Sequence, residues 1–170
     1  MIELPRRQLI TVLPRGEKLL ALSWRDGNMK YWINTVSKEH VMFGKKHGFV
    51  QANHGKESPL KRLKPGDKML FYSPKTSLDN GEPLKSFTAV AKIKDDDVYR
   101  ADMSDDFHPF RKNAEYEDCD EARIEPLIED LNFIRNKKSW GFMFRFGLFE
   151  INKHDFELIY SNMKKRQKAV

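Results

Sequence analysis

The stretch from Tyr31 to Pro74 constrains the fold of this chain more than any other part of the sequence. It holds two short β-prone stretches, a helix-like stretch between them, a polar loop and a Lys-Pro-Gly-Asp turn at residues 64–67. Proline presets φ at the second position of such a turn, and glycine accepts a reversed φ at the third. This order of signals predicts one compact unit in which a strand, a helix and a second strand lie together.

The rest of the chain continues with short elements. We expect strands at residues 30–35, 49–53, 68–73, 84–94, 108–116 and 142–151, and helices at residues 37–46, 126–131 and 153–163. Ser37 and Asn152 are the expected N-caps, and Gly48 is expected to end the first helix. One face of the strand at 84–94 is expected to carry Phe87, Ala89, Ala91 and Ile93. Short strands at close intervals with three helices predict an α+β fold, a small and partly open β-barrel decorated by helices. The strands are too few and too polar for a doubly wound parallel sheet.

Charge is unevenly distributed along the sequence. The chain carries a net charge of +6, but residues 95–130 hold fourteen acidic and four basic side chains, a local charge of −10. The remainder therefore carries +16. A basic majority with one acidic segment suits a polyanion that contacts a single face, and we expect residues 95–130 to face away from it.

Several classes of protein are disfavoured by the sequence. No segment approaches the roughly 20 apolar residues that span a bilayer, and the first residues do not resemble a signal peptide. Cys119 is the only cysteine, which fits a reducing compartment, so we expect a cytoplasmic protein without a membrane partner. The spacing of the glycines excludes a phosphate-binding loop, and His40, His47 and His54 are too far apart for a helical metal pair. We expect no metal and no cofactor.

A set of aromatic and amide side chains suggests a binding pocket rather than a catalytic centre. An aromatic ring can stack on a nucleobase, while amide and hydroxyl groups can hydrogen-bond to the edge of that base. Buried amides without partners are costly, so we expect a ligand to satisfy them. The candidate base-binding residues are Trp32, Asn34, Gln51, Asn53, Tyr72 and Ser73, with Phe144 and Arg145 as weaker candidates. The candidate phosphate contacts are Lys45, Lys46, Lys56, Lys61 and Arg62.

The two ends of the chain differ from its centre. Residues 1–28 consist of short apolar runs broken by Pro14 and Gly16, and we interpret them as an extension outside the domain. We hypothesise that Met29 is the true translation start. The domain is expected to span residues 29–163, and residues 164–170 form a basic tail.

The sequence resembles the EVE domain family, a branch of the PUA-like superfamily. The resemblance runs from about Met29 to Met163 and is carried by a set of short motifs. These motifs are Tyr31-Trp32-Ile33-Asn34, Gly48-Phe49, Gln51-Ala52-Asn53-His54-Gly55-Lys56, Pro65-Gly66-Asp67, Phe71-Tyr72-Ser73-Pro74, Pro109-Phe110-Arg111 and Gly147-Leu148-Phe149-Glu150-Ile151. The match is similar to that of single-domain bacterial and archaeal members.

The resemblance implies a PUA-like pseudo-barrel with a central pocket that accepts a flipped, often modified, base of DNA or RNA. It implies a non-enzymatic reader, whose pocket is formed by the candidate residues given above. The alternative is a small nucleotide- or RNA-processing enzyme, because the related ASCH domains can be catalytic. Asp67 and Arg111 are the nearest titratable candidates for such a role. A third interpretation, a protein–protein adaptor, needs an exposed apolar patch. The sequence leaves the oligomeric state open.

Overall fold

The structure is a computed structural model that describes residues 28–164. The elements are β1 (Tyr31–Thr35), α1 (Lys38–His47), β2 (Phe49–Val50), η1 (Asn53–Gly55), α2 (Glu57–Leu60), β3 (Lys68–Lys75), β4 (Pro83–Arg100), β5 (Phe110–Glu117), β6 (Ala122–Arg123), η2 (Glu125–Asp130), η3 (Lys137–Phe146), β7 (Leu148–Ile151) and α3 (Lys153–Met163). The label η marks a 3₁₀ helix. The expectations for residues 1–27 and 165–170 lie outside the described part of the chain.

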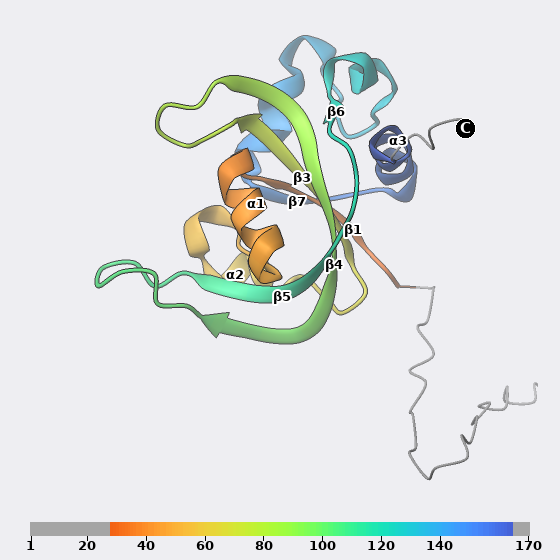
Figure 1. Ribbon diagram of the computed structural model, residues 1–170. Helices are drawn as coiled ribbons and strands as arrows, with labels where there is room; N and C mark the ends of the chain where they lie inside the picture. Colours follow the sequence, from red (N-terminus) through yellow and green to blue (C-terminus); the bar gives the residue numbers. More distant parts are fainter. Residues whose placement is uncertain (1–27, 165–170) are drawn as a thin grey trace, which may run out of the picture.

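One mixed sheet organises the domain. Its strand order is β2-β5-β4-β3-β1-β7, and β6 pairs with β4. The β1–β3 pair is parallel, with Ile33 opposite Leu70, and the other pairs are antiparallel. The sheet curves so that β4 and β5 wrap around α1, while α3 lies on the opposite side of the sheet (Figure 1). The expected α+β fold, a small β pseudo-barrel decorated by helices, is confirmed, and its barrel part is this one curved, mixed sheet.

The sheet separates two hydrophobic cores. Neighbouring residues of a strand point to opposite faces, so Trp32 and Phe71 belong to the core on the α1 and α2 side, whereas Ile33 and Tyr72 belong to the core on the α3 side. The second core also contains the buried residues of η2, η3 and α3. Along β1 and β3, alternate residues therefore point to the same side of the sheet, and neighbouring residues contribute to different cores.

A bulge in β4 reverses this alternation of side chains partway along the strand. Phe71 pairs with Ala89, but Tyr72 pairs with Phe87, so one extra residue, Thr88, is inserted. Phe87 consequently packs in the core on the α3 side, while Ala89 packs on the α1 side. The expectation that Phe87 shares a face with Ala89, Ala91 and Ile93 is wrong, because the strand is not regular at this position.

The element boundaries follow the expected caps at most positions. Gly48 ends α1 with a left-handed φ of 72°, and the Asn152 side chain accepts a hydrogen bond from Asp155 N at 2.8 Å at the start of α3. Ser37 occupies the N-cap position of α1 without a side-chain hydrogen bond. The expected strand at 142–151 is wrong in its first half, because Phe142–Phe146 belongs to η3. Gly147, at a φ of 73°, separates η3 from β7. Within residues 28–164, no helix is long and apolar enough to cross a membrane.

Candidate functional site

Three segments that are distant in sequence meet where β1 ends. Asn34 Nδ2 donates to the carbonyl of Gln51 at 2.9 Å, and Thr35 N donates to the carbonyl of Gly147 at 2.9 Å. Asn53 Nδ2 donates to the carbonyl of Phe146 at 3.3 Å. We call this group, Asn34, Thr35, Gln51, Asn53 and Gly147, the strand-end site. It joins the end of β1, the segment after β2 and the junction between η3 and β7.

The side chain of Asn34 leaves a hydrogen-bond acceptor free inside the protein. Asn34 is fully buried, and its amide orientation is fixed because the Gln51 carbonyl can only accept. Its Oδ1 has no protein partner among the described residues, and neither has Oγ1 of the neighbouring Thr35. An unsatisfied buried polar group costs roughly 1–3 kcal/mol. The strand-end site is therefore suited to a ligand that presents an N–H or O–H group.

Arg111 extends the polar surface next to Asn34, so this part of residues 95–130, a segment that we expected to face away from a polyanion, reaches the candidate site. Its Nε donates to Gln51 Oε1 at 3.3 Å, and its guanidinium lies 3.8 Å from the centre of the Phe49 ring. Burial lowers the pKa of Arg111, and Nη2 has no partner within the described part of the chain. Gln51 thus links a free acceptor on Asn34 to a free donor on Arg111.

A narrow hollow lies between α1 and the sheet, lined in part by His40, Gly44, Gln51 and Phe71, and it is too tight to hold a water molecule. A Cβ atom added at Gly44 would lie 2.7 Å from the carbonyl of Phe49, so α1 packs tightly here. Burial lowers the pKa of His40, and the positive charge of Arg111 lowers it further. The hollow is accordingly lined by a neutral imidazole at pH 7.

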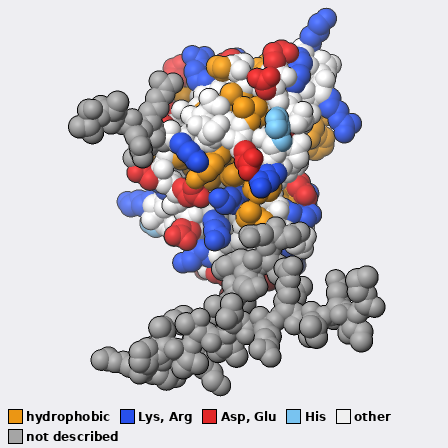
Figure 2. Space-filling view, turned by 90° about the vertical axis from the view of Figure 1, so that its right-hand side faces the viewer, with side chains coloured by type: hydrophobic (Ala, Val, Ile, Leu, Met, Phe, Trp, Pro, Cys, Tyr) orange, Lys and Arg blue, Asp and Glu red, His pale blue; other side chains and the backbone are white. Residues whose placement is uncertain are grey.

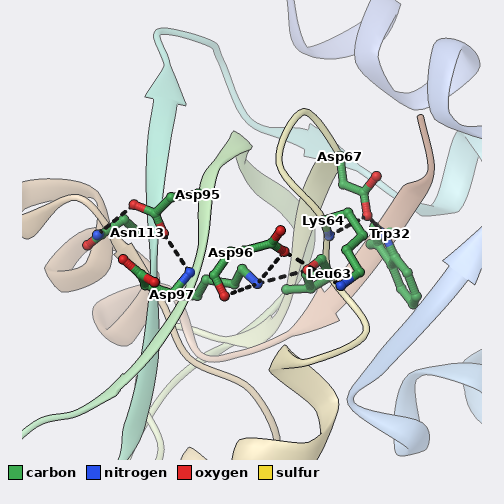
Figure 3. Close-up of polar contacts among 9 residues, drawn as sticks. Trp32, Leu63, Lys64, Asp67, Asp95, Asp96, Asp97 and Asn113 are labelled. Carbon is green, nitrogen blue, oxygen red and sulfur yellow. Dashed lines mark hydrogen bonds and ion pairs between the residues drawn. The ribbon is translucent and has the colours of Figure 1, made fainter. Parts of the chain in front are cut away.

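Trp32 is placed in the core rather than at the strand-end site. Its indole Nε1 donates to Asp67 Oδ2 at 2.9 Å, and the guanidinium of Arg62 lies 4.9 Å from its ring centre. Asp67 also accepts from Lys64 N at 3.0 Å (Figure 3) and from Lys30 N at 3.0 Å. Only 1% of Trp32 is exposed. Its ring and its N–H are thus already occupied by protein groups.

Tyr72 and Phe144 lie across the sheet from Trp32. Their rings stack with centroids 3.8 Å apart, and burial raises the pKa of Tyr72. Ser73 is fully buried, and its hydroxyl pairs with Thr88 Oγ1 at 2.8 Å beside the bulge. The structure therefore brings Asn34, Gln51 and Asn53 together but separates them from the Tyr72–Phe144 pair. That any of these side chains binds a base stays a prediction.

The candidate phosphate contacts occupy different surroundings. Lys46 and Lys56 are exposed, Lys45 is half-buried, and Lys61 pairs with Glu57 at 2.9 Å. Arg145 is exposed on η3, next to the buried Phe144. Figure 2 shows the face on the α3 side, where basic and acidic side chains are mixed with apolar ones. No continuous basic field covers that face.

Thr35, within the strand-end site, and Arg111, beside it, were not among the candidate base-binding residues. Thr35 looks like an ordinary strand residue in the sequence, and only the adjacency of Asn34 could have indicated it. Arg111 was considered only for catalysis, although it lies in one of the motifs that carry the family resemblance. The position of both depends on long-range packing, which spacing along the chain does not reveal.

Asp67, one of the two groups considered for catalysis, is engaged in structural contacts. Asp67 holds three N–H donors. Burial raises the pKa of Cys119, so its thiol is a weak nucleophile. Within the described residues, no three His, Cys, Asp or Glu side chains converge as metal ligands.

The fold and the site define a small α+β domain whose polar groups collect at the end of a parallel strand pair. The sequence model of the EVE domain matches residues 30–162, and the chain belongs to the EVE domain family. It is 49% identical to a UPF0310 protein of Mycolicibacterium vanbaalenii over 79% of this chain and 93% of that protein. It is 50% identical to a UPF0310 protein of Mycobacterium avium over 79% of this chain and 98% of that protein. A crystal structure from Pseudomonas putida is similar over 77% of this chain and 97% of that chain, with a TM-score of 0.49 and 12% identity.

Proposed function

We propose that the protein binds nucleic acid without catalysis and reads one nucleobase, often a modified one, at the strand-end site. The observation that carries the proposal is Asn34, whose buried amide is fixed by Gln51 and keeps Oδ1 free. The edges of nucleobases carry N–H donors that such an acceptor can discriminate, because a base without the donor leaves the amide unsatisfied.

The neighbouring groups support the same ligand class. A base edge carries acceptors as well as donors, and the free Nη2 of Arg111 can donate to an acceptor. The positive charge outside residues 95–130 attracts phosphates, which supply affinity without sequence preference. In this arrangement the charges provide strength, and the strand-end site provides selectivity.

The hollow beside the site is too tight for a water molecule, so a base edge reaches Asn34 only when side chains of α1 change rotamer. Changes of this size are common at binding interfaces. His40 lines the hollow and is the side chain whose displacement would widen it.

The proposal is tested with matched single-stranded and duplex DNA and RNA oligonucleotides that carry modified or unmodified bases. We expect the parent protein to prefer one base, and Asn34→Ala to lose this preference while keeping most of its affinity. Asn162→Ala is the control, because Asn162 Nδ2 donates to the carbonyl of Leu158 within α3, on the other side of the sheet. The proposal fails if the parent binds no oligonucleotide, or if Asn34→Ala discriminates as the parent does.

A further inference from the structure

Two phenylalanine rings of η3 are exposed next to the strand-end site. Phe142 is 55% exposed and Phe146 is 54% exposed, and their rings meet edge to face with centroids 5.6 Å apart. The same segment buries Phe144, whose ring stacks on Tyr72. The segment is thus held in place by its inward residues, and the outward pair is not needed for the core.

The aromatic pair is connected to the strand-end site through the backbone. The carbonyl of Phe146 accepts from Asn53 Nδ2, and the carbonyl of the next residue, Gly147, accepts from Thr35 N. The pair therefore lies one residue away from the group that holds the free acceptors of Asn34 and Thr35.

The charge around the pair is entirely positive in sequence. Residues 131–149 contain no Asp or Glu, and they include Arg135, Lys137, Lys138 and Arg145. Lys137 Nζ donates to the carbonyls of Ile128 and Leu131 at 2.8 Å and 2.9 Å, which anchors the segment. The other three cations are exposed and have no ion-pair partner in the described part of the chain. Exposed rings and unpaired cations on one segment match a ligand that combines flat apolar faces with negative charge.

We propose that Phe142 and Phe146 form a stacking platform for the unpaired nucleotide that flanks the base at the strand-end site. This inference rests on the proposed function and specifies its ligand as single-stranded or locally unpaired nucleic acid. Single-strand binding commonly combines aromatic stacking with a basic surface, whereas the bases of an intact duplex have both faces covered. Arg145 and Lys138 contact the phosphates of the same strand.

The test compares Phe142→Leu, Phe146→Leu and the double variant with the parent, using oligo(dT), oligo(dA) and their duplex. Leucine keeps an apolar side chain but removes the aromatic face. We expect each single change to weaken single-strand binding at least about fivefold, the lower end of the loss of one stacked base. Phe146→Tyr should bind the single strands like the parent, because tyrosine keeps the aromatic ring. Phe107→Leu is the control, since Phe107 is 41% exposed in the loop between β4 and β5.

The outcomes separate this inference from the proposed function. The platform is overturned if the parent binds the duplex as well as the single strands, or if the leucine variants bind like the parent while Asn34→Ala still loses discrimination. If the leucine variants keep the oligonucleotide affinity of the parent, residues 142 and 146 need only be apolar and not aromatic, which also overturns the platform. If the parent binds none of the oligonucleotides, both proposals fail. The melting temperature of each variant verifies that the exposed substitutions leave the fold intact.

Discussion

Asn53 and Leu148 join the two ends of the sheet through a side chain, since Leu148 N donates to Asn53 Oδ1 at 3.2 Å. β2 and β7 are the terminal strands of the sheet order and do not pair with each other. The amide of Asn53, shortly after β2, also donates to the carbonyl of Phe146 just before β7. One side-chain amide thus makes the two bonds that a neighbouring strand would make, and it closes the curved sheet at the strand-end site.

Asn53→Ala is expected to destabilise the protein by roughly 1–3 kcal/mol, because the buried N–H of Leu148 loses its acceptor. The φ of Asn53 is 46°, which alanine adopts poorly, so part of the cost is backbone strain. Asn53→Gly separates the two effects, since glycine accepts this φ but cannot form the bonds. Urea unfolding should give a loss for both variants and the larger loss for alanine. A glycine variant as stable as the parent would contradict the role of the amide.

Trp32→Ala is expected to lower the free energy of unfolding by about 3–5 kcal/mol, as for other buried aromatic residues. The indole fills the core under Arg62 and satisfies Asp67, so its loss leaves a cavity and a carboxylate with one donor fewer. The affinity of the folded fraction for oligonucleotides should remain within about twofold of the parent, because the ring is not needed for stacking. If Trp32→Ala has the melting temperature of the parent but does not bind oligonucleotides, Trp32 is part of the binding site.

Gly44→Ala tests how tightly α1 packs over the hollow. The added methyl group would lie 2.7 Å from the Phe49 carbonyl and 2.9 Å from the Tyr116 hydroxyl, so α1 must move. We expect a destabilisation of about 1–3 kcal/mol, typical of overpacking. Gly141→Ala is the matched control, because no atom lies within 4 Å of its added Cβ. Equal melting temperatures of the two variants would disprove the close contact.

Stability is expected to depend on pH through His40. Burial lowers its pKa in the folded state, Arg111 lowers it further and Glu39 raises it. The unfolded chain therefore binds this proton at a higher pH, and the folded state loses stability as the pH falls through about 6.5. His40→Gln should lose less stability than the parent between about pH 7.5 and about pH 5.5 in urea titrations. His47→Gln, at the exposed end of α1, serves as the control. Parallel losses in the parent and in His40→Gln would refute this assignment.

Salt should weaken nucleic-acid binding, and two lysines near α2 should contribute unequally. Lys56 is exposed, and no ion pair of its side chain occurs within residues 28–164, whereas Lys61 pairs with Glu57 at 2.9 Å. If Lys56 contacts a phosphate, Lys56→Ala reduces the slope of log affinity against log salt by about 1. Lys61→Ala should change the slope less, because Glu57 already offsets its charge. Binding isotherms over a range of salt concentrations provide the measurement, and an unchanged slope for Lys56→Ala removes that contact.

Local signals in the sequence were sufficient for α1 and α3. The helix after Asn152 and the helix that ends at Gly48 begin and end at the expected residues, because caps act within one turn. Periodicity failed at Phe87, where an inserted residue reverses the direction of the side chains. It also failed at Phe142–Phe146, because an aromatic-rich run suits a strand as well as a helical segment packed by Phe144.

The candidate site was predictable only in part for the same reason. Asn34, Gln51 and Asn53 lie together because β1 and the segment after β2 are brought side by side. The sequence places Tyr72 in the same candidate pocket. Because Tyr72 directly follows Phe71 in β3, its side chain points to the opposite face of the sheet. The register between strands decides such questions, and the register depends on partners that are remote in the sequence.

Gly147 gives the closure of the sheet a consequence for how this chain can vary. A side chain at this position would overlap the amide of Asn53, and its φ of 73° already favours glycine. Positions 147 and 53 are therefore not independent. Any residue with a Cβ at 147 displaces the Asn53 amide, which hydrogen-bonds to both neighbours of residue 147. A substitution at only one of the two positions would break the hydrogen bonds that link β7 to the segment after β2. We therefore expect the two positions to change together or not at all.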